Sequence, residues 1–192
     1  MLPESSAYGV KEWAVVVEAI RTGKQCYLLK KGGLTEPDHS DFERPGGLFG
    51  LIPTWKKQHP IHLRAESCRE FNEQLEGDDA SDSYGITTFV DITEQVVLSN
   101  PIRAHRLWER HVWRADYITE RINTRPEVPL HLLFVRAYEL ETPIELKREE
   151  SFGSMRHWVS LGQEASLSEA KVVLKDPEFK RETRIVRELL NA

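Results

Sequence analysis

PLHLLFVRAYEL, residues 129–140, is the strongest strand signal in the chain. Apolar, aromatic and β-branched side chains fill this segment, and such residues favour pleated, half-buried strands. Pro143 follows shortly before IELK, and proline cannot donate a hydrogen bond to a strand ladder. The segment therefore predicts a strand, with a turn or bulge at Pro143.

More strand signals lie on the N-terminal side of this segment. Residues 84–98 predict one or two strands, and residues 48–52 predict a strand that ends at Pro53. WAVVVEAI at 13–20 and QCYLL at 25–29 predict a hairpin, although a buried helix is the competing interpretation because a short apolar run does not fix its own period. We expect the core sheet to contain Val15 to Val17, Leu48 to Ile52, Phe89 to Ile92 and Leu132 to Val135.

Two helices are expected near the C-terminus. Ser166 and Glu169 fit a capping box for a short helix. Asp176 and Pro177 fit the N-cap and first position of a last helix. Its apolar stripe consists of Phe179, Thr183, Val186 and Leu190.

These elements indicate an α+β fold: a strongly bent, mostly antiparallel sheet or a small β-barrel, with peripheral helices. The length of 192 residues suits a single domain over residues 1–192. No apolar run approaches the roughly 20 residues of a membrane helix, and the polar start is unlike a secretion signal, so we expect a cytoplasmic protein without a membrane partner. Cys26 and Cys68 are expected to be reduced thiols.

The net charge of −5 is distributed unevenly. Residues 66–82 hold seven acids against Arg69 alone, and their composition predicts a mobile acidic loop at 72–83. Residues 101–125 hold six arginines against Glu109, Asp116 and Glu120. The arginine-rich segment at 101–125 is therefore the candidate binding surface for an anionic partner.

RAHRLWERHVWRADYITERI, residues 103–122, can form one helix with two distinct faces. The predicted core stripe consists of Ala104, Leu107, Trp108, His111, Ala115, Ile118 and Ile122. The opposite face, which is the predicted nucleic-acid-binding site, consists of Arg103, Arg106, Arg110, Trp113, Arg114, Tyr117 and Arg121.

Two interpretations of this basic face stay open. Asp116, Glu120 or the acidic loop can neutralise the arginines within the fold. Alternatively, the arginines contact phosphates while Trp113 or Tyr117 stacks on a base. A break of the segment near His111 into two shorter helices would dissolve the face.

Catalytic and metal-binding patterns are weak. Five histidines can in principle bind a metal, but no HExxH or cysteine pair accompanies them; they are His59, His62, His105, His111 and His157. The acid-x-lysine triplet Glu145 to Lys147 matches the end of a nuclease signature and lacks a clear partner acid. The sequence therefore predicts no metal site and no cofactor, and leaves catalytic residues unknown.

Six segments, taken in order, carry a resemblance to a known family: WAVVVEAI, LLKKGGL, IPTWKKQ, HVWRADYI, PLHLLFVRAY and VVLKDPEF. From Tyr8 to Leu190 the chain resembles the family called domain of unknown function 1802. Some members are fused to an Mrr-type restriction endonuclease domain, which implies a role beside DNA restriction and a restriction endonuclease partner. The succession of strand, basic helix and strand is also similar to PUA-like and EVE-type small barrels, a fold analogy only.

The expected function is nucleic-acid binding or sensing, of DNA or RNA, associated with restriction or defence. The alternatives are a metal-dependent nuclease or other hydrolase, and a protein-interaction module.

Overall fold

The computed structural model describes residues 5–32, 48–55, 59–78, 83–147 and 158–192, with the side chains of 74–78 left out. Its centre is a seven-stranded sheet, in which β7 pairs with β5 beside the main order β2-β5-β4-β3-β1-β6. The strands are β1 (Ser5–Trp13), β2 (Tyr27–Lys31), β3 (Leu48–Thr54), β4 (Ser83–Leu98), β5 (Leu130–Lys147), β6 (Trp158–Ser166) and β7 (Lys171–Val172).

The pairing of β1 with β3 is parallel, and the other strand pairs are antiparallel. β2 and β6 stand at opposite ends of the order, so the sheet formed by the described strands is open and is not a closed barrel. The predicted α+β class with a mostly antiparallel sheet is confirmed. The barrel alternative is not realised among these strands.

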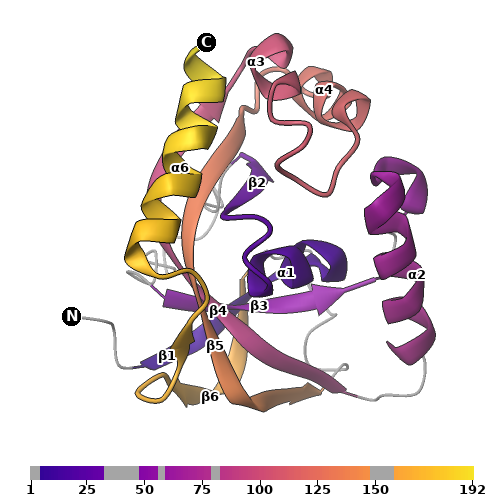
Figure 1. Cartoon of the computed structure of the whole chain (residues 1–192). Helices are drawn as coiled ribbons and strands as arrows, with labels where there is room; N and C mark the ends of the chain where they lie inside the picture. The colour runs from indigo at the N-terminus through magenta and orange to yellow at the C-terminus, as the bar shows by residue number, and fades with distance from the viewer. Residues whose placement is uncertain (1–4, 33–47, 56–58, 79–82, 148–157) are drawn as a thin grey trace.

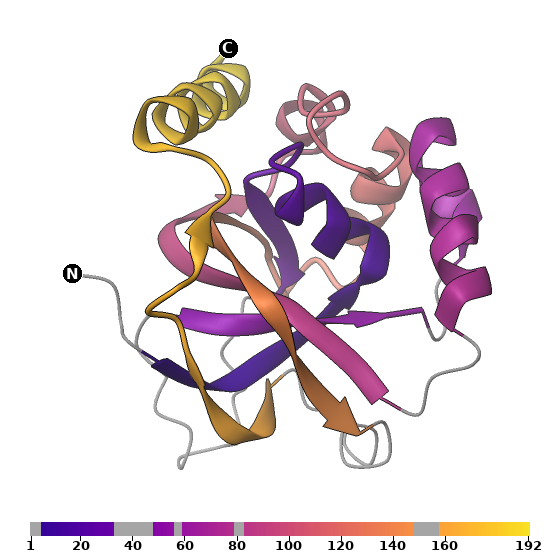
Figure 2. The same ribbon diagram turned by 60° about the horizontal axis from the view of Figure 1, so that its bottom comes forward.

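A bulge in β5 contributes to the bend of the sheet. Between Glu139 and Ile144 the register of β5 shifts against Ile86 and Thr88 of β4. Pro143 lies within this interval, as the sequence predicted, and bulges increase the local twist of a strand. Figure 2 shows the result: β4 and β5 run in a different direction from β1 and β3.

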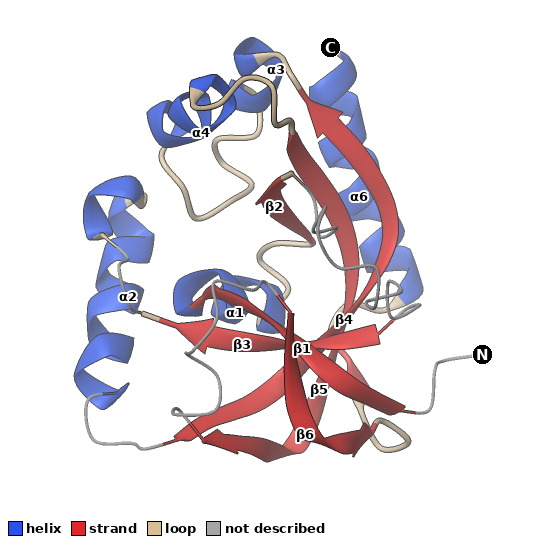
Figure 3. Ribbon diagram, turned by 180° about the vertical axis from the view of Figure 1, so that it is seen from behind, coloured by secondary structure: helices blue, strands red, loops and turns tan. Residues whose placement is uncertain are grey.

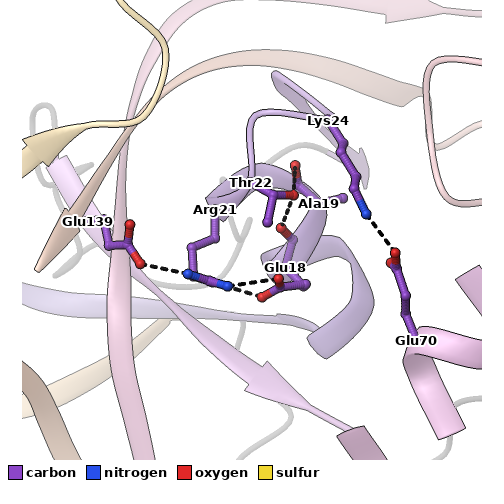
Figure 4. Close-up of polar contacts among 7 residues, drawn as sticks. All are labelled: Glu18, Ala19, Arg21, Thr22, Lys24, Glu70 and Glu139. Carbon is purple, nitrogen blue, oxygen red and sulfur yellow. Dashed lines mark hydrogen bonds and ion pairs between the residues drawn. The ribbon is translucent and has the colours of Figure 1, made fainter. Parts of the chain in front are cut away.

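WAVVVEAI does not form the first strand of a hairpin, so that prediction is wrong. Trp13 ends β1, and the valines lie in α1 (Ala14–Arg21), which occupies the hollow of the bent sheet in Figure 1. Six of the eight residues of α1 are buried, so no polar face reveals a helical period. Arg21 fixes the end of α1 through ion pairs to Glu18 and to Glu139 of β5, both at 2.8 Å (Figure 4).

The last helix is confirmed as α6 (Asp176–Asn191), and its predicted stripe of Phe179, Thr183, Val186 and Leu190 is buried. Its N-cap is Lys175 and not Asp176 as predicted, so the helix begins one residue earlier. Figures 1 and 3 show α6 along the upper part of β4 and β5. The predicted short helix at Ser166 is wrong, because Ser166 ends β6 and a turn leads to β7. The predicted strands at 48–52, 89–92 and 132–135 are confirmed, and β3 continues through Pro53 to Thr54.

The acidic segment begins as a helix. α2 (Ala65–Asp78) covers the first part of the predicted acidic loop at 72–83, and residues 79–82 lie outside the described residues. Phe71 anchors α2 in the core. None of the described helices is both long and apolar enough to cross a membrane.

Candidate functional site

The arginine-rich segment does not form one helix, so that prediction is corrected. It folds as α3 (Pro101–His105), an irregular turn, and α4 (Ala115–Asn123). An antiparallel bridge between Leu63 and Trp113 interrupts it. Two backbone hydrogen bonds flank the bridge, from Arg64 N to the Val112 oxygen and from Arg114 N to the His62 oxygen, both at 2.9 Å. These bonds to a distant segment replace the helical bonds that residues 112–114 would otherwise form.

The two aromatic residues of the predicted face pack inward. Trp113 is 2% exposed, and its ring centroid lies 4.4 Å from that of Trp13. Tyr117 is half-buried and stacks on the His62 ring at 4.2 Å. Trp113 therefore cannot stack on a base without leaving the core.

The five arginines of the predicted face separate in the structure. Arg110 pairs with Glu182 at 3.4 Å, Arg114 with Asp116 at 2.8 Å, and Arg121 donates to the Leu29 oxygen at 3.2 Å. Arg103 and Arg106 are exposed, and neither forms an ion pair with another described residue. Arg103 and Arg106 are thus the arginines of this set that can meet a phosphate at the least cost.

Trp108, predicted as a core residue, is instead 47% exposed. The guanidinium carbon of Arg64 lies 5.5 Å from its ring centroid, within the range of a cation–π contact. Both side chains line a groove of about 770 Å³, which we call the Trp108 groove. It is lined by Pro60, Ile61, Leu63, Arg64, Ala65, Glu66, Cys68, His105, Trp108, Trp113, Arg114, Ala115 and Asp116.

Each ion pair of the Trp108 groove includes an exposed acid. Arg64 lies 3.7 Å from Glu66, and the side chains of Arg114 and Asp116 are 50% and 68% exposed. Exposed ion pairs of this kind contribute about 0–1 kcal/mol. An incoming phosphate can therefore displace these acids from their arginines.

A second cavity, of about 320 Å³, lies behind Arg64, which lines both spaces. We call it the His111 pocket, because His111 lines it and is 4% exposed. Among described residues neither ring nitrogen of His111 has a hydrogen-bond partner. Burial, with a smaller contribution from the Arg64 charge, lowers the pKa of His111 to about 4, and the backbone of Trp113 acts in the opposite direction.

The described part of the chain shows no metal-binding set. Within the described ranges no three His, Cys, Asp or Glu side chains are placed to hold an ion. The rings of His59 and His62 are 6.5 Å apart, and His157 lies outside the described residues. Glu145 of the acid-x-lysine triplet accepts a hydrogen bond from Ser83. The metal-dependent nuclease alternative gains no support from these side chains.

Sequence patterns missed Arg64 as a site residue. It lies far from the arginine-rich segment, and the bridge between Leu63 and Trp113 brings it there. No local signal marks it. The sequence did carry a signal for Trp108. Its place in the predicted core stripe holds only if residues 103–122 form one helix, and the anticipated break near His111 allows the Trp108 ring to face solvent.

Comparisons with known proteins give a family and one structural likeness. A family model described as "Domain of unknown function (DUF1802)" matches residues 9–184. A search of curated proteins gave no match. The crystal structure of a mutant of the ZmASCH protein from Zymomonas mobilis aligns with 96% of this chain and 99% of that one, at 11% identity and a TM-score of 0.42.

Proposed function

The chain belongs to the family described as domain of unknown function 1802, and this description assigns no activity. We propose that the chain binds single-stranded nucleic acid through the Trp108 groove. The observation that carries this proposal is the exposed Trp108 ring beneath the Arg64 guanidinium. The predicted function is kept, while its aromatic contact moves from Trp113 and Tyr117 to Trp108.

An exposed tryptophan is a platform for an unpaired base. Stacking of a base on an aromatic side chain contributes roughly 1–3 kcal/mol and tolerates any base, since every base has a π face. A base in a duplex is already stacked on its neighbours, so a single strand satisfies this platform best. Arg64, which lies over the Trp108 ring, can contact the adjoining phosphate.

Cationic side chains line the groove or lie close to Trp108 in the sequence. Arg103 and Arg106 lie on α3 and just after it, close in sequence to Trp108, and Arg114 lines the groove. The acids nearby are Glu66, Glu109 and Asp116, all exposed. Because these acids are exposed, they keep most of their hydration and repel a strand only weakly. Arginines that bind phosphates release counterions from the strand, which favours binding.

A fluorescence anisotropy titration with a labelled single-stranded oligonucleotide at low salt tests the proposal. We expect saturable binding by the full chain, weakened in Trp108→Ala and unchanged in Val97→Ala. Val97 is a matched control because it is 52% exposed on β4, outside the groove. Equal affinity of the two variants would remove the groove from the binding site. The expected partnership with a restriction endonuclease stays a separate prediction.

A further inference from the structure

Two acids line the Trp108 groove, Glu66 from the first turn of α2 and Asp116 from the first turn of α4. The Asp116 carboxylate is occupied, because one oxygen accepts from Arg114 at 2.8 Å and the other from Tyr117 N at 3.0 Å. Glu66 Oε2 lies 3.7 Å from Arg64 Nε, which is too long for a hydrogen bond, and no other described residue donates to it. Glu66 is therefore the carboxylate of this groove that has both oxygens free to accept.

Arg64 lies near both this carboxylate and the stacking platform. Its guanidinium carbon is 5.5 Å from the ring centroid of Trp108, and its Nε is 3.7 Å from Glu66 Oε2. The Glu66 side chain is 75% exposed, so it can rotate about its side-chain bonds without leaving a packed environment. Its carboxylate can therefore reach the edge of a base that stacks on Trp108.

A carboxylate with two free oxygens distinguishes among the bases. An ionised carboxylate accepts hydrogen bonds and donates none. Guanine presents two adjacent donors on its Watson–Crick edge, N1–H and N2–H2, whereas adenine, cytosine and thymine or uracil each present one donor group there. This edge is accessible in an unpaired base. A carboxylate can therefore accept two parallel hydrogen bonds from guanine and a single one from any other base.

An acid in a groove that binds a strand repels phosphate, weakly but for every sequence. Selective sites combine such repulsion with an attraction that the correct partner alone receives. We infer that Glu66 makes the Trp108 groove select guanine, by accepting hydrogen bonds from N1–H and N2–H2 of a base stacked on Trp108. The inference rests on the proposed function, and it adds base selectivity to a stacking contact that by itself tolerates any base.

Anisotropy competition with short strands that are abasic except for one central base tests the inference, because the stacked base is then defined. The central base is guanine, hypoxanthine, adenine, cytosine or thymine, and hypoxanthine keeps N1–H but lacks the 2-amino group. We expect the full chain to bind the guanine strand about fivefold more tightly than the adenine, cytosine and thymine strands, the lower end for a bidentate contact because Glu66 is exposed. The hypoxanthine strand should fall in between.

Glu66→Gln removes the charge and one of the two acceptor oxygens. Its preference for guanine should fall to less than about twofold, while the thymine strand binds at least as tightly as before, because the repulsion of phosphate is lost. Glu109→Gln is the matched control, since Glu109 is an exposed acid outside the groove, and it should keep the guanine preference.

Equal affinity of the unmodified chain for all five strands would overturn the inference and leave the proposed function standing. The same holds if hypoxanthine binds as tightly as guanine, or if Glu66→Gln keeps the full preference. Absence of binding by every strand would instead overturn the proposed function, and the inference with it.

Discussion

The guanidinium carbon of Arg64 lies 5.5 Å from the ring centroid of Trp108, and Arg64 stands between the Trp108 groove and the His111 pocket. Arg64 is held in place by its backbone bond to Val112 and by the start of α2 immediately after it. It lines both the Trp108 groove and the His111 pocket. A ligand in either space therefore meets the same cation.

Two substitutions of Arg64 distinguish the effect of its charge on strand binding from the effect of its planar shape. Arg64→Lys keeps the charge but loses the planar group that stacks on Trp108. We expect Arg64→Lys to weaken single-strand binding without changing its salt dependence. Arg64→Gln should weaken binding further and make the slope of log K against log salt shallower by roughly 0.7, the value for one phosphate contact on a single strand. Identical slopes for Arg64→Gln and the unmodified chain would place Arg64 away from phosphate.

The two tryptophans of the arginine-rich segment should differ in their effect on stability. Trp113 is 2% exposed and packs on Trp13, so Trp113→Ala should lower the free energy of unfolding by about 3–5 kcal/mol. Trp108→Ala should change it by about 0.5 kcal/mol, as exposed residues usually do. Urea denaturation followed by circular dichroism measures both. A large loss for Trp108→Ala would show that its ring supports the fold.

A buried ion pair between β1 and β2 gives a prediction independent of any ligand. Lys30 Nζ lies 2.7 Å from Glu12 Oε2, and both side chains are less than a tenth exposed. Lys30→Met should cost about 3–5 kcal/mol, because it leaves the Glu12 charge buried and unpaired. The double variant Lys30→Met, Glu12→Leu should recover much of this loss. A double variant as unstable as the single one would contradict this explanation.

Burial of His111 predicts a dependence of stability on pH. The folded-state pKa of about 4 lies below the reference value of 6.5, so the unfolded chain binds a proton more readily in between. Stability should therefore be highest above pH 6.5 and fall as the pH drops toward 4, by about 3 kcal/mol at most. Comparison of urea denaturation for the unmodified chain and His111→Gln isolates this effect from the carboxylates. Parallel pH profiles would show that His111 is not buried in its neutral form.

The sequence predicted those elements whose pattern arises within the element itself. α6 carries proline in its first turn and a regular apolar stripe, and both features are local. β5 is continuous enough in β-forming residues to be recognised, and Pro143 marks its bulge.

The errors at α1 and in the arginine-rich segment share one physical cause, which is a tertiary contact that local periodicity does not encode. α1 is buried on most sides by the bent sheet, so its valines resemble a strand. The bridge between Leu63 and Trp113 breaks the arginine-rich segment and turns Trp113 inward. The same bridge brings Arg64 to Trp108, so the groove was missed even though the basic segment beside it was recognised.

The most direct test of nucleic-acid binding through the Trp108 groove is one set of salt titrations by anisotropy with a labelled single strand. The experiment compares the unmodified chain with three variants. These are Trp108→Ala, the double variant Arg103→Gln with Arg106→Gln, and the control Arg184→Gln on the exposed surface of α6. We expect Trp108→Ala to lose roughly 1–3 kcal/mol with an unchanged slope, because a stack carries no counterions. The arginine pair should lower the slope by roughly 1.4, the value for two phosphate contacts, and Arg184→Gln should change neither. No binding at low salt, or equal behaviour of all four proteins, would contradict the account.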